Sequence, residues 1–380
     1  MTNHESPVDV LIIGTGVSGL IAARALQSAG RSVLLLDKGR GLGGRLASRR
    51  IGAATFDHGA QFITTRDARF EEILKQGAEA GMMTDWCQGF SAEAAGHTRW
   101  RGQPAMTAFA KYLAQGLEIR MEKQVVAVRR AGDRYSVETS TGDFFSAAAV
   151  LLTPPVPQSL ALLAAGEIEL DGAMRTRLEG IQYERCLAVM AALKESSLIP
   201  PPGGLVPTSG PVSWIADNQL KGISKEPAVT IHANHEFSLA HWDDDRMESG
   251  RWLLDASKQW LGAEVLSYQV HGWRYSKPIQ VDAHRCALLQ ASPPLVMAGD
   301  AFAGPRVEGA ALSGFAAAET LLAHLPHSWG QSLPLAVKAV KITSNNSPLY
   351  ETSPIDAHLP DGPSQFLRID ADLHTAHHHL

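Results

Sequence analysis

The sequence contains little cysteine, no long apolar run and no excess of positive charge, and each shortage excludes a class of protein. The three cysteines in 380 residues, Cys87, Cys186 and Cys286, lie far apart and form no Cys-x-x-Cys pair. This spacing indicates neither a zinc site nor a redox dithiol, so we expect three reduced thiols. The net charge of -5 gives no reason to expect a nucleic acid partner.

The sequence also lacks a membrane segment and a targeting signal. No run of about 18 apolar residues occurs, and residues 1–7 do not combine a basic region with an apolar stretch. We therefore expect a cytoplasmic protein with no membrane partner. Its 380 residues, 45% of them hydrophobic, suffice for about two folded domains.

The opening 37 residues carry the clearest pattern. Residues 8–13 predict a buried parallel strand, and Gly14, Gly16 and Gly19 then open a helix that leads to a second strand closed by Asp37. Glycines at this spacing permit a tight turn, close approach of a diphosphate and close packing of helix on strand. The helix N-terminus adds N–H donors and a positive dipole end. A carboxylate at this place accepts hydrogen bonds from ribose hydroxyls and repels a 2′-phosphate, so the unit predicts NAD or FAD. A glycine-rich turn without a ligand is the alternative.

A basic, glycine-rich loop follows over residues 38–50, with four glycines and five cationic side chains. Backbone N–H groups of repeated glycines can point at phosphate oxygens, and arginine adds bidentate charge. The loop therefore predicts a further phosphate contact, and a solvated basic turn is the alternative.

Four motifs, taken in order, resemble the flavin-binding signature of the amine oxidase superfamily and, within it, the renalase family, particularly its bacterial members. They are the glycine pattern above, Gly43-Gly44-Arg45 with Asp57-x-Gly59-Ala60-Gln61-Phe62, Trp100-x-Gly102-x-Pro104-x-Met106, and Leu295-Val296-Met297-Ala298-Gly299-Asp300 with Arg306-Val307-Glu308-Gly309-Ala310. The resemblance covers roughly residues 8–325.

The resemblance implies an α/β fold with a Rossmann-type FAD-binding domain, of the glutathione reductase and amine oxidase type, and a smaller α+β substrate domain. We expect a discontinuous FAD-binding domain over residues 1–80, 101–165 and 289–326, and a substrate domain over 81–100 and 166–288. Short strands over 118–152 predict a β-meander. Residues 327–380 match no part of the family and are expected to form a C-terminal extension, either docked or partly disordered.

The resemblance implies one FAD, held without a covalent bond because the superfamily's flavin-attaching cysteine is missing from the turn before Arg306. Val126 is expected to contact the adenine through its backbone, and Asp300 to lie toward the ribityl and diphosphate groups. Gln61 either contacts the flavin or is structural. The implied cofactor-binding residues are Gly14, Thr15, Gly16, Val17, Ser18, Gly19, Asp37, Lys38, Gly43, Gly44, Arg45, Ala60, Gln61, Val126, Gly299, Asp300, Arg306, Val307 and Ala310.

The activity implied by the resemblance is oxidation of aberrant dihydronicotinamide dinucleotides, the 2- or 6-dihydro isomers of NAD(P)H, to NAD(P)+, with O2 as acceptor and H2O2 as product. Hydride transfer to a flavin requires no protein nucleophile or base, so no catalytic side chain is predicted. The implied substrate contacts are Phe62, Ile63, Thr64, Thr65, Arg66 and Ala303. Bacterial relatives often have Tyr in place of Phe62 and a bulkier residue in place of Ala303, which leaves the isomer open.

Two other functions stay open. A flavin-containing amine oxidase would need an aromatic cage and commonly a lysine near the flavin, and Trp273, Tyr275 and Lys277 lie on one face of a predicted strand. Alternatively, the chain binds FAD or a nucleotide without catalysis, and residues 327–380 bind a partner.

No metal site is predicted. Asp243, Asp244 and Asp245 are consecutive and do not converge on one ion, so we expect a solvated helix start. The histidines near the C-terminus, at 374 and 377–379, lie in the extension without a fixed arrangement of ligands.

Overall fold

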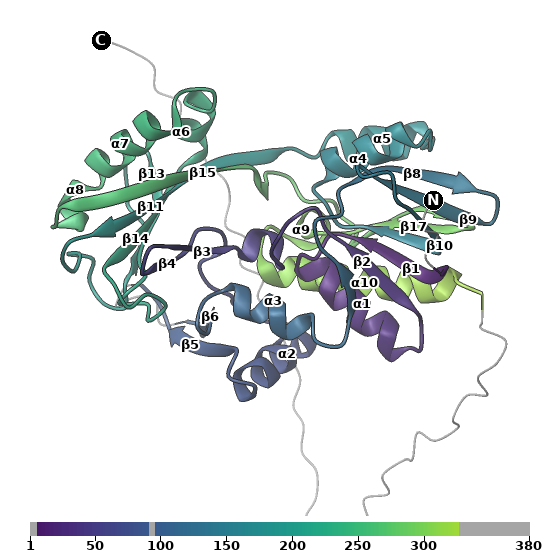
Figure 1. The fold of residues 1–380 in the computed structure, drawn as a ribbon, viewed down its shortest axis with the longest axis horizontal. Coiled ribbons are helices and arrows are strands. Elements are labelled where there is room, and N and C mark those ends of the chain that lie inside the picture. The colour runs from purple at the N-terminus through teal and green to yellow at the C-terminus, as the bar shows by residue number, and fades with distance from the viewer. Residues whose placement is uncertain (1–5, 91–95, 327–380) are drawn as a thin grey trace, which may run out of the picture. The chain divides into compact units, whose positions relative to one another are not determined.

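The computed structural model describes residues 6–90 and 96–326. The C-terminal extension over 327–380, with its histidine cluster, lies outside the described residues. Figure 1 shows the described part as two sheets with helices packed against them.

The first sheet is the predicted nucleotide-binding sheet. Its strands run in the order β16 (Ala287–Ala291), β17 (Pro294–Met297), β10 (Phe144–Leu152), β1 (Val8–Ile13), β2 (Val33–Leu36) and β7 (Glu118–Arg120), and β9 (Arg134–Thr139) and β8 (Val125–Ala131) continue from β10. Strands β8, β9 and β10 form the predicted meander, but its expected first strand, β7, pairs parallel with β2 instead. Strands β17, β10, β1, β2 and β7 are parallel. The Rossmann-type fold class is therefore confirmed.

Alternation along β1 supplies both faces of this sheet with core residues. Val10 and Ile12 pack into one core, against α1 (Val17–Ser28), α2 (Ala68–Glu79), α3 (Thr107–Leu113) and α10 (Val307–His324). Leu11 and Ile13 pack into the other, with α4 (Val156–Ala165) and α5 (Gly172–Glu179). Helices α1 and α10 approach closely at Gly314, where a Cβ would lie 2.4 Å from the Ser18 carbonyl oxygen. A side chain at position 314 would separate the two helices whose N-termini border the candidate site.

The second sheet is antiparallel. Its order is β12 (Gly204–Leu205), β13 (Val212–Asp217), β14 (Ala228–Ala233), β11 (Tyr183–Leu193) and β15 (Val265–Pro278). Helices α6 (His235–Ala240), α7 (Arg246–Ala256) and α8 (Lys258–Leu261) accompany this sheet, and Figure 1 shows β11 and β15 extending from it toward α4 and α5. This is the mixed substrate region that the resemblance implied.

The described part also contains a single 3-10 turn, Gly44–Leu46, the short helix α9 (Asp300–Ala303), and two short strand pairs. Strands β3 (Ser48–Ile51) and β4 (Ala54–Asp57) form one, and β5 (Met83–Cys87) and β6 (Arg99–Gly102) form the other. Ala54 and Phe56 of β4 pack against Met190 and Ala228 of the second sheet. The domain boundaries that we predicted stay a prediction. Strand β4 lies by sequence in the predicted FAD-binding domain, but it packs on the second sheet.

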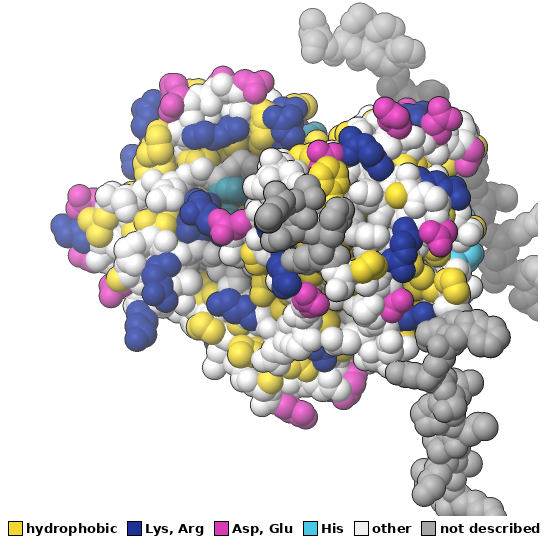
Figure 2. Space-filling model, turned by 45° about the vertical axis from the view of Figure 1, so that its right-hand side comes forward, with side chains coloured by type: hydrophobic (Ala, Val, Ile, Leu, Met, Phe, Trp, Pro, Cys, Tyr) yellow, Lys and Arg dark blue, Asp and Glu magenta, His cyan; other side chains and the backbone are white. Residues whose placement is uncertain are grey.

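No helix of residues 6–90 and 96–326 is long and apolar enough to cross a membrane. Figure 2 shows basic and acidic side chains interspersed over the visible face of the molecule.

Candidate functional site

A cavity of about 700 Å³ lies where the predicted motifs meet. Its walls come from the start of α1, the Gly43–Leu46 turn, the segment after β4, the second sheet, and the turn between β17 and α10. Of the predicted cofactor residues, those that line it are Gly16, Val17, Ser18, Gly43, Arg45, Ala60, Gln61, Gly299, Asp300, Arg306, Val307 and Ala310. Those that do not are Gly14, Thr15, Gly19, Asp37, Lys38, Gly44 and Val126.

The opening turn fits a dinucleotide. Gly14 has a φ of +104°, which favours glycine, and a Cβ on Gly19 would lie 2.2 Å from the Gly14 carbonyl oxygen. Gly16 lines the cavity, and a Cβ there would meet no protein atom within 4 Å. The Ser18 hydroxyl in the first turn of α1 is buried without a hydrogen-bond partner. An anion at this helix N-terminus would satisfy that hydroxyl and occupy the space beside Gly16.

The Asp37 carboxylate accepts hydrogen bonds from other residues of the protein. Its Oδ2 accepts hydrogen bonds from the Thr15 backbone N–H and the Thr15 hydroxyl, both at 2.7 Å, and its Oδ1 accepts one from the Gly39 N–H at 2.7 Å. The carboxylate therefore ties the glycine turn to the basic loop. A carboxylate can accept about four hydrogen bonds, and three of those positions on Asp37 are occupied. The ribose contact that we predicted for Asp37 stays a prediction and would use the remaining position.

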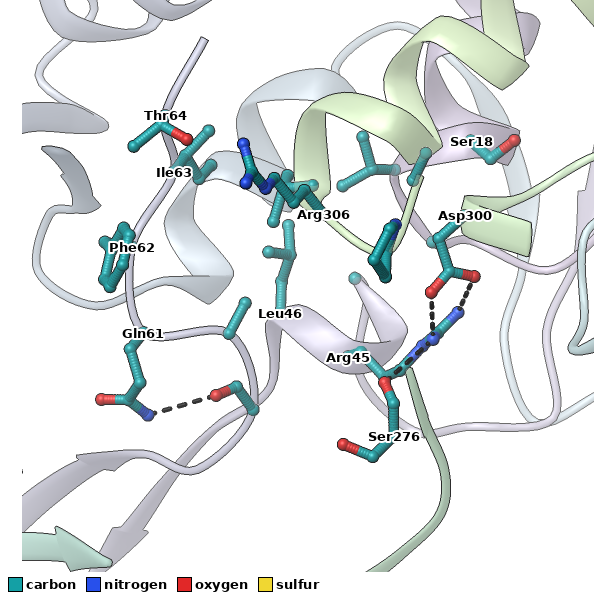
Figure 3. A pocket seen from close by; sticks show the side chains of 18 of the residues that line it. Ser18, Arg45, Leu46, Gln61, Phe62, Ile63, Thr64, Ser276, Asp300 and Arg306 are labelled. Atoms are coloured by element: carbon teal, nitrogen blue, oxygen red, sulfur yellow. Dashed lines mark hydrogen bonds and ion pairs between the residues drawn. The ribbon is translucent and has the colours of Figure 1, made fainter. Parts of the chain in front are cut away.

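Arg45 pairs with Asp300 at one side of the cavity, as Figure 3 shows. The pair is bidentate, with nitrogen–oxygen distances of 2.6 and 2.8 Å, and Arg45 also donates to the Ser276 carbonyl. Burial opposes the guanidinium charge, but the adjacent Asp300 outweighs burial and raises the pKa of Arg45. The pair joins the Gly43-Gly44-Arg45 turn to the Leu295–Asp300 motif, so it holds two walls of the site together. The Asp300 carboxylate also balances the charge of Arg45.

The segment after β4 is held by its own backbone and by Arg45. The Ala60 N–H donates to the Arg45 carbonyl at 2.8 Å, and a Cβ on Gly59 would lie 2.1 Å from the same oxygen. The Gln61 side-chain amide donates to the carbonyls of Asp57 and Gly59, while its Oε1 is buried without a partner. These bonds favour the structural role of Gln61. Its Oε1 is left as a hydrogen-bond acceptor without a partner beside the cavity.

A buried ion pair anchors the beginning of this segment, and nothing in the sequence predicted it. The Lys221 ammonium lies 2.8 Å from Asp57 Oδ2, and both side chains are fully buried. Asp57 Oδ1 accepts hydrogen bonds from the Ser48 hydroxyl at 2.6 Å and the Met106 N–H at 3.0 Å. Burial lowers the pKa of Lys221, and Asp57 opposes that shift.

Aromatic rings form the wall beside the predicted substrate segment. The Phe62 ring lies 5.3 Å from that of Phe90 and 5.7 Å from that of Trp214, measured between centroids. The Trp214 indole N–H is buried without a partner. Arg99 lies over both Phe62 and Phe90, with its guanidinium carbon 5.6 and 4.9 Å from their centroids. Of the predicted substrate contacts, Phe62, Ile63, Thr64 and Arg66 line the cavity, and Thr65 and Ala303 do not.

Three histidines gather around Trp273 on the second sheet's side of the cavity. His232 Nε2 and Trp273 Nε1 both donate to the His58 carbonyl, at 3.1 and 2.8 Å. The His271 ring lies 4.2 Å from that of Trp273. Burial lowers the pKa of His58 to about 3 and those of His232 and His271 to about 4. The three histidines are therefore uncharged near neutral pH. His58 is more than 170 residues from His232 and His271 in the sequence, so sequence analysis did not predict this cluster.

The residues considered for an amine oxidase separate in the structure. Trp273 lines the cavity, but Tyr275 packs edge-on against Tyr183 at 5.4 Å, and Lys277 pairs with Glu184 at 3.1 Å. No lysine lines the cavity among residues 6–90 and 96–326.

Other predictions concern features outside the cavity. Asp245 accepts hydrogen bonds from the N–H groups of Met247 and Glu248 and caps α7, as expected for a helix start. The three cysteines are free.

Comparison with known proteins agrees with this geometry. A model for NAD(P)-binding Rossmann-like domains matches residues 12–76, and a model for flavin containing amine oxidoreductases matches residues 77–322. Renalase of Mus musculus is 24% identical over 79% of this chain and 94% of its own length. Putrescine oxidase of Kocuria rosea is 37% identical over 20% of this chain and 15% of its own length.

The fold is also that of solved oxidase structures. A structure of putrescine oxidase bound to putrescine superimposes with a TM-score of 0.59 at 15% identity, over 84% of this chain and 99% of that one. Because the family model covers more than half of the sequence, the chain belongs to the flavin-containing amine oxidoreductases and is a renalase-like, flavin-dependent oxidoreductase.

Proposed function

We propose that this protein is an FAD-dependent oxidase of 2- or 6-dihydro isomers of NAD(P)H. One dihydronicotinamide, one O2 and one proton give one NAD(P)+ and one H2O2. The similarity to mouse renalase over most of both chains supports this proposal. So does the resemblance to renalases in the Arg306–Ala310 motif, whose residues Arg306, Val307 and Ala310 line the cavity.

The observation that carries the proposal is the shortage of acid–base groups in the cavity wall. Among the described lining residues the only carboxylate is Asp300, which is paired with Arg45, and no lysine is present. Two histidines also line the cavity: His232 is neutral near pH 7, because burial lowers its pKa to about 4, and His97 is exposed at the rim. A hydride donor requires no proton removal, whereas an amine arrives as a cation that must be paired and deprotonated. The wall therefore suits a dihydropyridine better than an amine.

The side chains have binding and positioning roles in this proposal. Gly16, Ser18 and Gly43 would hold the cofactor's diphosphate at the start of α1, and the Arg45–Asp300 pair would fix the turn beside it. When bound, FAD supplies the hydride acceptor and passes the electrons to O2.

The opposite walls would position the donor ring. Phe62, Trp214 and Trp273 would stack around it and exclude water. The unpartnered Trp214 N–H would donate to a carboxamide oxygen. The N-terminus of α10, which lines the cavity, adds a positive dipole end there and would favour negative charge on the reduced cofactor.

Anaerobic stopped-flow mixing tests the proposal. The FAD-loaded protein is mixed with 2-dihydro-NAD(P), 6-dihydro-NAD(P), ordinary NADH and putrescine, and the visible flavin absorbance is followed. We expect one dihydro isomer to bleach the flavin within seconds and NADH to act much more slowly. Rapid bleaching by an amine would favour the amine oxidase alternative, and bound FAD that no donor reduces would favour a binding protein without catalysis.

A further inference from the structure

The cavity carries a surplus of positive charge on the side away from the Arg45–Asp300 pair. Its described lining contains four arginines, Arg45, Arg66, Arg99 and Arg306, and one acid, Asp300. Because Arg45 is bound bidentately by Asp300, three guanidinium groups line the cavity without a carboxylate among the described lining residues.

Strand pairing places Arg99 beside the substrate segment. Ile63 and Trp100 exchange two backbone hydrogen bonds of 2.8 Å in an antiparallel bridge. Counting outward from that bridge, Thr64 lies opposite Arg99, and alternation directs both side chains to the cavity face. Both residues line the cavity, which agrees with this register. The Arg99 Nε–H is buried without a partner and remains available to a ligand.

Glu308 holds Arg66 next to the start of α10. The Glu308 Oε1 accepts hydrogen bonds from the Thr65 hydroxyl and from the N–H groups of Arg66 and Asp67. Arg306 immediately precedes α10, and Figure 3 shows its side chain directed toward Ile63 and Thr64. Arg66 and Arg306 therefore both line the cavity near the start of α10.

The acids near this end are already engaged. Glu308 is occupied by three donors, and Asp67 binds Arg69 at 3.1 Å and caps α2. Arg66 and Arg306 are both exposed and line the cavity. The three donors to Glu308 are uncharged, so Glu308 keeps its negative charge, whereas Asp67 is balanced by Arg69. Arg66, Arg99 and Arg306 against Glu308 still leave an excess of two positive charges (three minus one), so this end attracts anions.

We propose that Arg66, Arg99 and Arg306 form an anion subsite that binds the diphosphate of the dinucleotide substrate. Guanidinium groups match phosphate oxygens bidentately, and two or three of them match a doubly charged diphosphate. In Figure 3 this end lies across the pocket from Ser18, where the cofactor's own diphosphate would bind. The inference rests on the proposed function only in naming a dinucleotide as the substrate.

The first test measures anion binding without turnover. Inorganic pyrophosphate is titrated into the FAD-loaded protein, and binding is followed by calorimetry and by the change in the flavin spectrum. We expect Arg66→Ala and Arg99→Gln to weaken binding about tenfold or more each, while Arg251→Ala, an exposed arginine on α7, leaves it unchanged. Equal binding by all four proteins would overturn the subsite.

The second test uses a substrate without phosphates. The kcat/KM for the dihydro-NAD isomer is divided by the kcat/KM for the matching 1-methyl-dihydronicotinamide. We expect this ratio to fall about tenfold in Arg66→Ala, and an unchanged ratio would overturn the subsite while leaving the proposed function intact. Pyrophosphate binding that depends on Arg66 and Arg99, in a protein that no dihydronicotinamide reduces, would support the subsite and refute the proposed function.

Discussion

Replacing Lys221 with Met should destabilise the protein strongly, because it breaks a buried ion pair. Lys221 and Asp57 are fully buried and lie 2.8 Å apart. Met has a similar length and no charge, so Lys221→Met leaves the Asp57 carboxylate buried without its cation. Breaking such a pair typically costs about 3–5 kcal/mol.

The remaining contacts of Asp57 place the expected loss at the lower end of that range. The Ser48 hydroxyl and the Met106 N–H still donate to Asp57 Oδ1 in the variant. We therefore expect the free energy of unfolding to fall by about 3 kcal/mol. An unfolding entropy of about 2.1 cal/mol/K per residue gives a shift of about 1.5 °C per kcal/mol for a folded part of this size, so the Tm should fall by about 4–5 °C. Asp57→Asn should cost at least as much, since it leaves the buried ammonium unpaired.

A double-mutant cycle separates this pair from general packing. Wild type, Lys221→Met, Asp57→Asn and the double variant are unfolded with urea at equal excess FAD, and tryptophan fluorescence gives the free energies. The double variant should lose less than the sum of the single losses by about 2 kcal/mol. A loss below about 1 kcal/mol for Lys221→Met, or additive losses, would refute the reasoning.

Three further predictions concern the cofactor and the histidines. Gly16→Val should fold, because a Cβ there meets no protein atom within 4 Å, and should lose FAD; unchanged flavin content in the purified variant would contradict this. Acid precipitation should release the flavin into the supernatant, since the attachment is expected to be non-covalent, and colour retained in the pellet would count against it. The pKa values of His58, His232 and His271 lie at about 3 to 4, below the ordinary 6.5, so unfolding takes up protons in acid. Their contribution to stability should be complete above pH 6.5 and be lost as the pH falls toward 4; urea midpoints that stay constant over this range would exclude it.

The nucleotide-binding start was predictable because its physics is local. Alternating apolar residues of β1 and the three glycines lie within 12 consecutive residues, 8–19. Gly14 requires a positive φ and Gly19 a close approach, and each requirement appears directly as a residue type. The same locality explains why the three strands β8 to β10 of the meander and the strand before Asp300 were predicted correctly, whereas the strand at 118–120 pairs with the distant β2 and was wrongly placed in the meander.

Roles that depend on distant partners were not predictable. Arg45 and Asp300 are 255 residues apart, and their pairing gives Arg45 a structural partner that local sequence does not show, while its predicted cofactor contact stays a prediction. Asp37 likewise has its predicted role constrained by Thr15 and Gly39. No local pattern shows which of several charged residues will meet once two sheets pack together.

The sequence by itself determined that this protein has a Rossmann-type sheet and a flavin oxidase family signature, because hydrophobic periodicity and glycine placement act over a few residues. Only the tertiary structure decided that Asp57 would bury Lys221, that three neutral histidines would surround Trp273, and that Arg66, Arg99 and Arg306 would border one cavity. Those outcomes depend on how the β3–β4 hairpin, the second sheet and α10 pack against one another, and packing between distant segments leaves no trace in local sequence spacing.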